Sequence, residues 1–210
     1  MRAADNGGAG EKVTPVNNLV EFFRDGFAKA LAHQHVSLDE HTSHYVVSLL
    51  ALYSRTEVSH RDLRPGQRWV SLSGLLAQAS AAASSAEREA LLQRLGDVSL
   101  FVAGFFAHGF EPRLVDVDYH IAMGGRAYGT LAAAQISRPR RTLCGVFDEL
   151  ARKFQGVVDA IGEISDTARV WGPSDVLGLY ELWLKTGSHR AQGLLRRLGV
   201  VPLPASLQMN

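Results

Sequence analysis

The stretch Val98-Ser-Leu-Phe-Val-Ala-Gly-Phe-Phe-Ala-His-Gly-Phe110 carries no formal charge and lies between Asp97 and Glu111. A second segment, Asp118-Tyr-His-Ile-Ala-Met-Gly-Gly-Arg-Ala-Tyr-Gly-Thr-Leu-Ala-Ala-Ala134, follows after a short polar break and is rich in small residues. The first run is shorter than the roughly 18 apolar residues of a membrane-spanning helix, so it indicates a buried helix. We expect the two segments to form a closely packed helix pair at the centre of a helical domain.

The composition is that of an ordinary globular protein. The chain has 210 residues, of which 46% are apolar and 20% charged, and this length can bury a core without disulfides or metal. A net charge of +1 provides no overall attraction to nucleic acid or anionic membranes. Cys144 is the only cysteine, which excludes an intrachain disulfide. With no apolar signal segment near the start, these features predict a cytoplasmic location and no membrane association.

Apolar periodicity along the chain predicts an all-α fold, a compact single-domain bundle of roughly eight helices. We expect a disordered tail over residues 1–14, a helical core domain over 15–172, and a C-terminal helical hairpin with its tail over 173–210, packed on the core. The expected helices cover 16–32, 38–54, 69–76, 85–95, 98–108, 118–136, 143–164, 174–185 and 189–198. Gly96-Asp97 is expected either to interrupt the helix that opens at Ser84 or to start the buried helix 98–108.

Two capping boxes define predicted helix starts. In Ser37-Leu-Asp-Glu40 and Ser84-Ser-Ala-Glu87, a serine and a glutamate are placed to bond the free N–H groups of a first turn. The polar segment 56–66 ends in Arg-Pro-Gly and is expected to be a loop. Later in the chain, Gly187 and Ser188 predict a helix end followed directly by a helix start.

Five of the eight histidines fall between residues 33 and 60. Glu40 and His44 are four residues apart, and His41 and His44 three, so either pair shares a helix face and could bind a divalent metal. Glu40 already has a capping role, however, and a dimetal bundle needs further Glu-x-x-His motifs on facing helices. Surface histidines are therefore the preferred interpretation, and a metal site at Glu40, His41 and His44 is the alternative.

Asp97 is an acid at the edge of an uncharged run, so it should be a helix cap, an ion-pair partner or a site residue. A structural pair with Arg126 is the preferred interpretation. The alternative is a pocket between the two apolar helices, and its predicted lining is Asp97, His108, Tyr119, His120 and Arg126. A haem or another hydrophobic ligand could occupy it, with His108 or His120 as the axial ligand.

The glycines of the second segment have a structural interpretation. Gly125 and Gly129 are four residues apart and would allow close helix crossing. A phosphate-binding loop is excluded because no strand precedes the segment and the Gly-x-Gly-x-x-Gly pattern is missing.

The last two predicted helices resemble the layout of a helix-turn-helix, with Arg190, Arg196 and Arg197 on the second one. Cations there could contact phosphates, which makes DNA binding a further hypothesis, although helical hairpins with a glycine turn are common.

Three functional hypotheses follow from these patterns. The leading one is a non-catalytic regulatory or partner-binding module that binds a protein partner or forms a homo-oligomer. The first alternative is an enzyme or sensor that holds a divalent metal, haem or another cofactor in a helical bundle. The second alternative is a DNA-binding regulator.

Overall fold

The computed structural model describes residues 19–60, 71–106, 117–135, 141–167, 171–172 and 175–202. Within these ranges the chain forms eight helices and no strand, so the predicted all-α fold is confirmed. The helices are α1 (Leu19–His33), α2 (Glu40–His60), α3 (Leu72–Ala81), α4 (Ser85–Phe106), α5 (Val117–Gln135), α6 (Arg141–Asp166), α7 (Val176–Thr186) and α8 (His189–Arg197). No helix of the described part is long and apolar enough to cross a bilayer.

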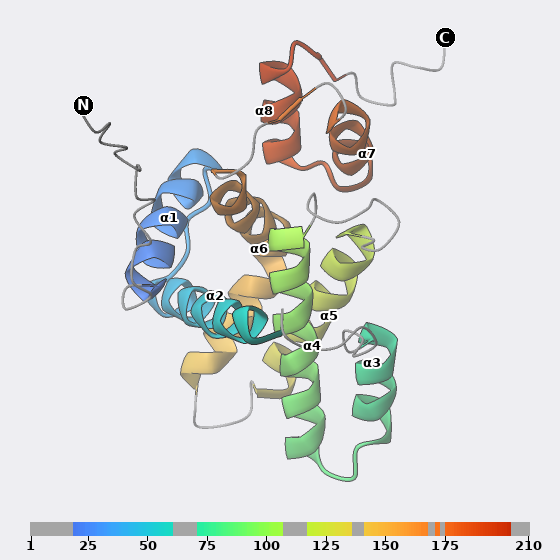
Figure 1. Cartoon of the computed structure of the whole chain (residues 1–210). Helices are drawn as coiled ribbons and strands as arrows, with labels where there is room; N and C mark the ends of the chain where they lie inside the picture. Colours follow the sequence, from blue (N-terminus) through green and yellow to red (C-terminus); the bar gives the residue numbers. More distant parts are fainter. Residues whose placement is uncertain are drawn as a thin grey trace, which may run out of the picture.

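Helices α4, α5 and α6 form the centre of the molecule and all three pack on one another. Helix α3 packs on α4, and α1 and α2 pack on α6 and on each other. The α7–α8 pair lies at one end of the bundle, beyond the ends of α5 and α6 (Figure 1). The predicted central pair, α4 and α5, is therefore completed by a third helix, α6.

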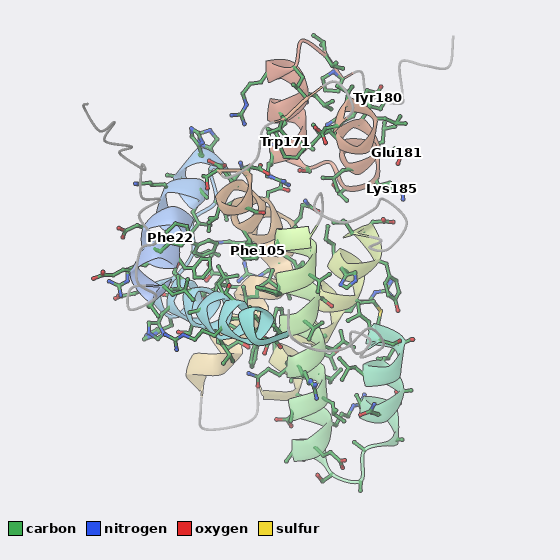
Figure 2. All side chains as sticks on the ribbon, in the orientation of Figure 1. Phe22, Phe105, Trp171, Tyr180, Glu181 and Lys185 are labelled. Atoms are coloured by element: carbon green, nitrogen blue, oxygen red, sulfur yellow. The ribbon has the colours of Figure 1, made fainter. Side chains whose placement is uncertain are left out.

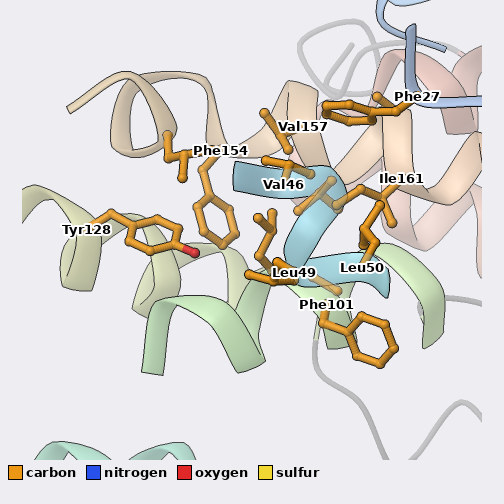
Figure 3. Close-up of a cluster of buried hydrophobic side chains, with 14 of the residues drawn as sticks. Phe27, Val46, Leu49, Leu50, Phe101, Tyr128, Phe154, Val157 and Ile161 are labelled. Atoms are coloured by element: carbon orange, nitrogen blue, oxygen red, sulfur yellow. The ribbon is translucent and has the colours of Figure 1, made fainter. Parts of the chain in front are cut away.

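The core is continuous across these helices (Figure 3). It is filled by large apolar side chains that are almost fully buried, and Figure 3 shows Phe27, Val46, Leu50, Phe101, Tyr128, Phe154, Val157 and Ile161 among them. Most of the side chains that α6 contributes repeat at three- and four-residue intervals, the spacing from which its sequence predicted an amphipathic helix.

Glycines allow the central helices to approach closely, although the critical positions differ from the predicted ones. Gly125 and Gly129 do face α6, where an added Cβ would make an ordinary 3.8 Å contact with Ala151. At Gly124, an added Cβ would overlap the ring of Phe154. The close crossing of α5 and α6 therefore depends on Gly124 rather than on the predicted Gly125 and Gly129.

One of the two predicted capping boxes is confirmed. The Ser84 hydroxyl accepts the N–H of Glu87 at 3.1 Å, and the Glu87 carboxylate accepts the N–H of Ala83 at 3.0 Å. Helix α4 begins there and runs through Gly96 and Asp97 to Phe106, so the expected division of this segment into two helices is wrong.

The Ser37–Glu40 box is wrong, because α2 begins at Glu40 and its cap is Asp39. The Asp39 carboxylate accepts the N–H of His41 at 2.8 Å, and Glu149 of α6 accepts the N–H of Asp39 at 3.0 Å. The glutamate that bonds this N–H group is thus Glu149 of another helix, and the predicted Glu40 is exposed. The predicted loop is also wrong over residues 56–60, because α2 continues to His60.

Several predictions lie outside the described residues. They are the tail over 1–14 and residues 61–66 of the predicted loop. The side chain of Cys144 is also outside this part of the structure.

Candidate functional site

Asp97 lies half-buried where α2, α4 and α5 meet. Its Oδ1 atom accepts a hydrogen bond of 2.6 Å from the Tyr45 hydroxyl and one of 2.7 Å from the Tyr128 hydroxyl. The Gln93 side chain donates to the Tyr45 hydroxyl at 3.1 Å. We call these four residues the Asp97 cluster. The predicted pair with Arg126 is not formed, because the Arg126 side chain is exposed and the partners of Asp97 are tyrosines.

Aromatic packing fixes the two tyrosines. Phe147 of α6 stacks on Tyr128, with the ring centroids 5.5 Å apart, and contacts Tyr45 edge-on at 5.8 Å. Gly96 makes room for Tyr128, since an added Cβ there would lie 2.5 Å from the tyrosine ring. The two hydroxyl groups are therefore aimed at Asp97 by the packing of four helices.

The Asp97 cluster places a carboxylate among neutral donors. Burial raises the pKa of Asp97 to about 6, and the hydrogen bonds from Tyr45 and Tyr128 oppose this rise. Burial and the nearby charge of Asp97 raise the pKa values of both tyrosines. The same two causes raise the pKa of Tyr53 to about 12. Of these groups, Asp97 alone is expected to change its charge between about pH 4 and pH 8.

The structure does not bring together those residues of the predicted pocket that it describes. His120 lies eight residues before Tyr128 on α5, which corresponds to about 12 Å along the helix axis. Tyr119 is 42% exposed, Arg126 is exposed, and His108 lies outside the described residues. Among the described residues, His120 Nδ1 is a buried atom without a hydrogen-bond partner, and burial lowers the pKa of this histidine.

The predicted metal ligands are surface residues. Glu40, His41 and His44 are all exposed at the start of α2. No group of three histidine, cysteine or acidic side chains within the described ranges is arranged to hold a metal ion. Within the part of the chain that the structure describes, Glu40, His41 and His44 are therefore not arranged as the ligands of a metal ion.

A hollow of about 490 Å³ lies between α3 and α4. It is lined by Gln78, Ala81, Ala82, Glu87, Ala90, Leu91 and Arg94. None of these residues belongs to the Asp97 cluster or to the predicted sites.

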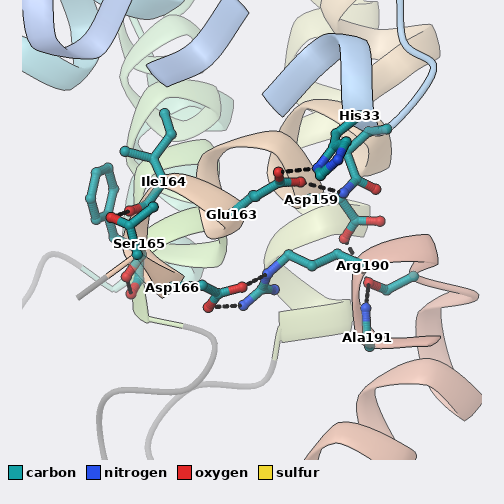
Figure 4. Close-up of polar contacts among 12 residues, drawn as sticks. His33, Asp159, Glu163, Ile164, Ser165, Asp166, Arg190 and Ala191 are labelled. Atoms are coloured by element: carbon teal, nitrogen blue, oxygen red, sulfur yellow. Dashed lines mark hydrogen bonds and ion pairs between the residues drawn. The ribbon is translucent and has the colours of Figure 1, made fainter. Parts of the chain in front are cut away.

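A second polar cluster joins α8 to α6 (Figure 4). Arg190 donates two hydrogen bonds to Asp166, from Nε at 2.7 Å and from Nη2 at 2.9 Å. The Ser188 hydroxyl donates to Asp159 at 2.7 Å and, as the cap of α8, accepts the N–H of Ala191 at 3.0 Å. We call Asp159, Asp166, Ser188 and Arg190 the α8 joint.

The α8 joint changes the role of a predicted DNA contact. Arg190 is only 4% exposed and its guanidinium group is paired with Asp166. It is therefore closed to a phosphate in this structure, while Arg196 and Arg197 are exposed in the last turn of α8. The cap at Ser188 and the left-handed Gly187 at the end of α7 are confirmed.

Sequence reasoning missed the acids of α6. Asp159 is 2% exposed and follows the buried Val157 and Val158, so an acid within a run of core residues was the signal that could have found it. Asp166 lies seven residues later on the same helix face. Gly162 lies between them, and an added Cβ there would come within 2.6 Å of the Arg190 guanidinium carbon.

The outer face of α7 carries apolar side chains. Leu177 is 69% exposed and Leu184 is 46% exposed, and Tyr180 between them is half-buried. Figure 2 shows Tyr180, Glu181 and Lys185 on the side of α7 that is turned away from α6. We call Leu177, Tyr180 and Leu184 the α7 stripe.

Comparison of the chain with protein-family models, with curated proteins and with solved structures gave no match.

Proposed function

We propose that the protein is a non-catalytic helical regulatory module that binds another polypeptide through the α7 stripe. The observation that carries the proposal is the exposure of Leu177 and Leu184 on one face of a well-formed helix. Full burial of a leucine side chain contributes about 1.5–3 kcal/mol, so a partner that covers both gains a substantial part of its binding energy there.

The spacing of the α7 stripe favours a helical partner. Its residues follow one another at intervals of three and four, the pattern by which one helix packs its apolar face against a helix or groove. Glu181 and Lys185 are exposed beside the stripe and would form the polar rim of such an interface. One helix face is a small surface, so we expect a transient complex of less than about 1,200 Å².

Site-specific crosslinking tests the proposal directly. A photoreactive amino acid at position 177 should form a crosslinked product in the source cell, and the additional change Leu184→Ser should abolish that product. The matched control places the same amino acid at Leu52 of α2, a leucine that is 62% exposed and far from α7 in the fold. A product that forms equally at position 52, or that survives Leu184→Ser, would overturn the proposal.

Sedimentation equilibrium identifies the partner class. If the partner is a second copy of the chain, the apparent mass of the wild type should rise with concentration, and Leu177→Ser/Leu184→Ser should remain at 22.8 kDa. A monomeric wild type combined with a stripe-dependent crosslink indicates a different polypeptide. A monomeric wild type without any stripe-dependent crosslink contradicts the proposal.

A further inference from the structure

The α7–α8 hairpin is capped and packed largely within itself. Gly187 adopts the left-handed conformation (φ 67°) that ends α7, and its N–H bonds the carbonyl of Trp183 at 2.8 Å. The N–H of Val200 closes the end of α8 on the carbonyl of Leu195 at 2.9 Å. Each helix of the hairpin contacts the other more extensively than it contacts α5 or α6.

The polar attachment of the hairpin to α6 uses three positions on one helix face. Asp159, Gly162 and Asp166 are three and four residues apart, and they receive Ser188 and Arg190 of α8. Figure 4 shows Asp166 and Arg190 reaching across the gap between the two helices. An additional ion pair of 3.7 Å joins Lys185 to Asp118 of α5.

A polar joint of this kind separates more readily than the central helix contacts. When α8 leaves α6, water can hydrate the carboxylates and the guanidinium group, which offsets part of the lost bonding. Separation of α4, α5 and α6 would instead expose Phe101, Tyr128, Phe154 and Ile161, for which water offers no such compensation. Regions with few contacts to the rest of a fold open as cooperative units below the free energy of global unfolding.

We propose that the α7–α8 hairpin opens from the core as one unit, and that the α8 joint is the latch that sets how often it opens. The inference is independent of any partner for the α7 stripe. Because the stripe lies on the hairpin, every opening also moves the stripe relative to the core.

Native-state hydrogen exchange of the full chain tests this proposal. In the wild type, the amides of residues 177–197 should exchange with a common opening constant, and they should be at least about tenfold less protected than the central amides of α4, α5 and α6. Asp166→Asn removes the charge that faces Arg190, so hairpin exchange should accelerate at least about tenfold, and the hairpin should remain less protected than the central helices.

Asp148→Asn is the matched control. It removes the acid of the exposed pair Asp148–Arg152 on the same helix and should leave hairpin exchange unchanged. The proposal is overturned if Asp166→Asn accelerates hairpin exchange no more than Asp148→Asn, or if the hairpin of this variant is as protected as the central helices. If Asp166→Asn does not fold, the wild-type protein alone tests the proposal. Wild-type hairpin amides that are as protected as those of α4, α5 and α6 would overturn it.

Discussion

The Asp97 cluster and the α8 joint both enclose carboxylates, but the hydrogen-bond partners of these carboxylates differ. Asp97 receives two hydroxyl groups and has no cation among these partners. Asp166 receives a guanidinium group through two parallel hydrogen bonds. The comparison shows two ways in which the fold holds an enclosed carboxylate, by neutral hydroxyl donors at Asp97 and by a cation at Asp166.

The environment of Asp159 combines features of both. Burial raises its pKa, while the hydrogen bond from Ser188 and the charge of Arg190 lower it. The charge of Arg190 therefore supports both acids of the α8 joint, whereas Asp97 loses its charge when the pH falls. We therefore expect the free energy of unfolding to vary with pH because of Asp97. At the α8 joint, we expect it to depend on the presence of the Arg190 guanidinium group.

The largest expected effect follows from Arg190→Met, which keeps much of the side-chain volume and removes the cation. Asp166 would then remain enclosed without its partner, and the free energy of unfolding should fall by about 3–5 kcal/mol in urea denaturation. Arg197→Met, at an exposed position of the same helix, is the control and should change stability by no more than about 0.5 kcal/mol. Equal effects of the two changes would show that the enclosed pair has no special role.

Asp97→Asn should abolish the pH dependence of the Asp97 cluster. The folded-state pKa of about 6 lies above the ordinary value of 3.8, so Asp97 favours the folded state most below about pH 4, and this contribution is lost as the pH rises through 6. A shift of this size corresponds to about 3 kcal/mol. Asparagine can still accept both tyrosine hydroxyls but carries no charge.

The measurement is the free energy of unfolding of wild type and Asp97→Asn at about pH 4 and about pH 7. Taking the difference between the two proteins removes the contribution of the other titrating groups. This difference should move by about 2–3 kcal/mol in favour of the variant as the pH rises from about 4 to about 7. A difference that is constant over this range would contradict the environment assigned to Asp97.

Tyr45→Phe should have a smaller effect with the same pH signature. It removes one of the two donors to Asp97, which costs about 1–3 kcal/mol when the acceptor is charged and less when it is neutral. The loss should therefore be larger at about pH 7 than at about pH 4 in thermal or urea unfolding. Tyr119→Phe, a change at an exposed tyrosine, is the control. A loss from Tyr45→Phe that is independent of pH would indicate that its ring packing, rather than its hydroxyl, is what matters.

Helix positions were largely predictable from local patterns. The caps at Ser84 and Ser188 and the end at Gly187 depend on backbone groups within a few residues, so the sequence carries their signals. The cap of α2 was predictable only in part, because the acid that bonds the N–H of Asp39 is Glu149, which is 110 residues away along the chain. Tertiary contacts of this kind leave no local signal.

The candidate site was predictable only in part, for the same reason. Asp97 was conspicuous as a charge beside an apolar run, but its partners are 52 and 31 residues away and lie on two other helices. Arg126 was a natural candidate partner for it, yet it belongs to the exposed face of α5. The charge pattern therefore identified the buried acid, while only the helix arrangement could identify its donors.

The smallest expected effect concerns an ion pair whose shortest N–O distance equals that of the α8 joint. The distance between Arg152 Nη2 and Asp148 is 2.7 Å, equal to that between Arg190 Nε and Asp166, but the two side chains are 64% and 54% exposed. Because water and salt screen an exposed pair, Asp148→Asn should leave the melting temperature unchanged within error, whereas Arg190→Met lowers it clearly. Calorimetry at low and high salt measures the melting temperatures of both variants. A large loss from Asp148→Asn would mean that bond length, rather than enclosure, determines the contribution of these pairs.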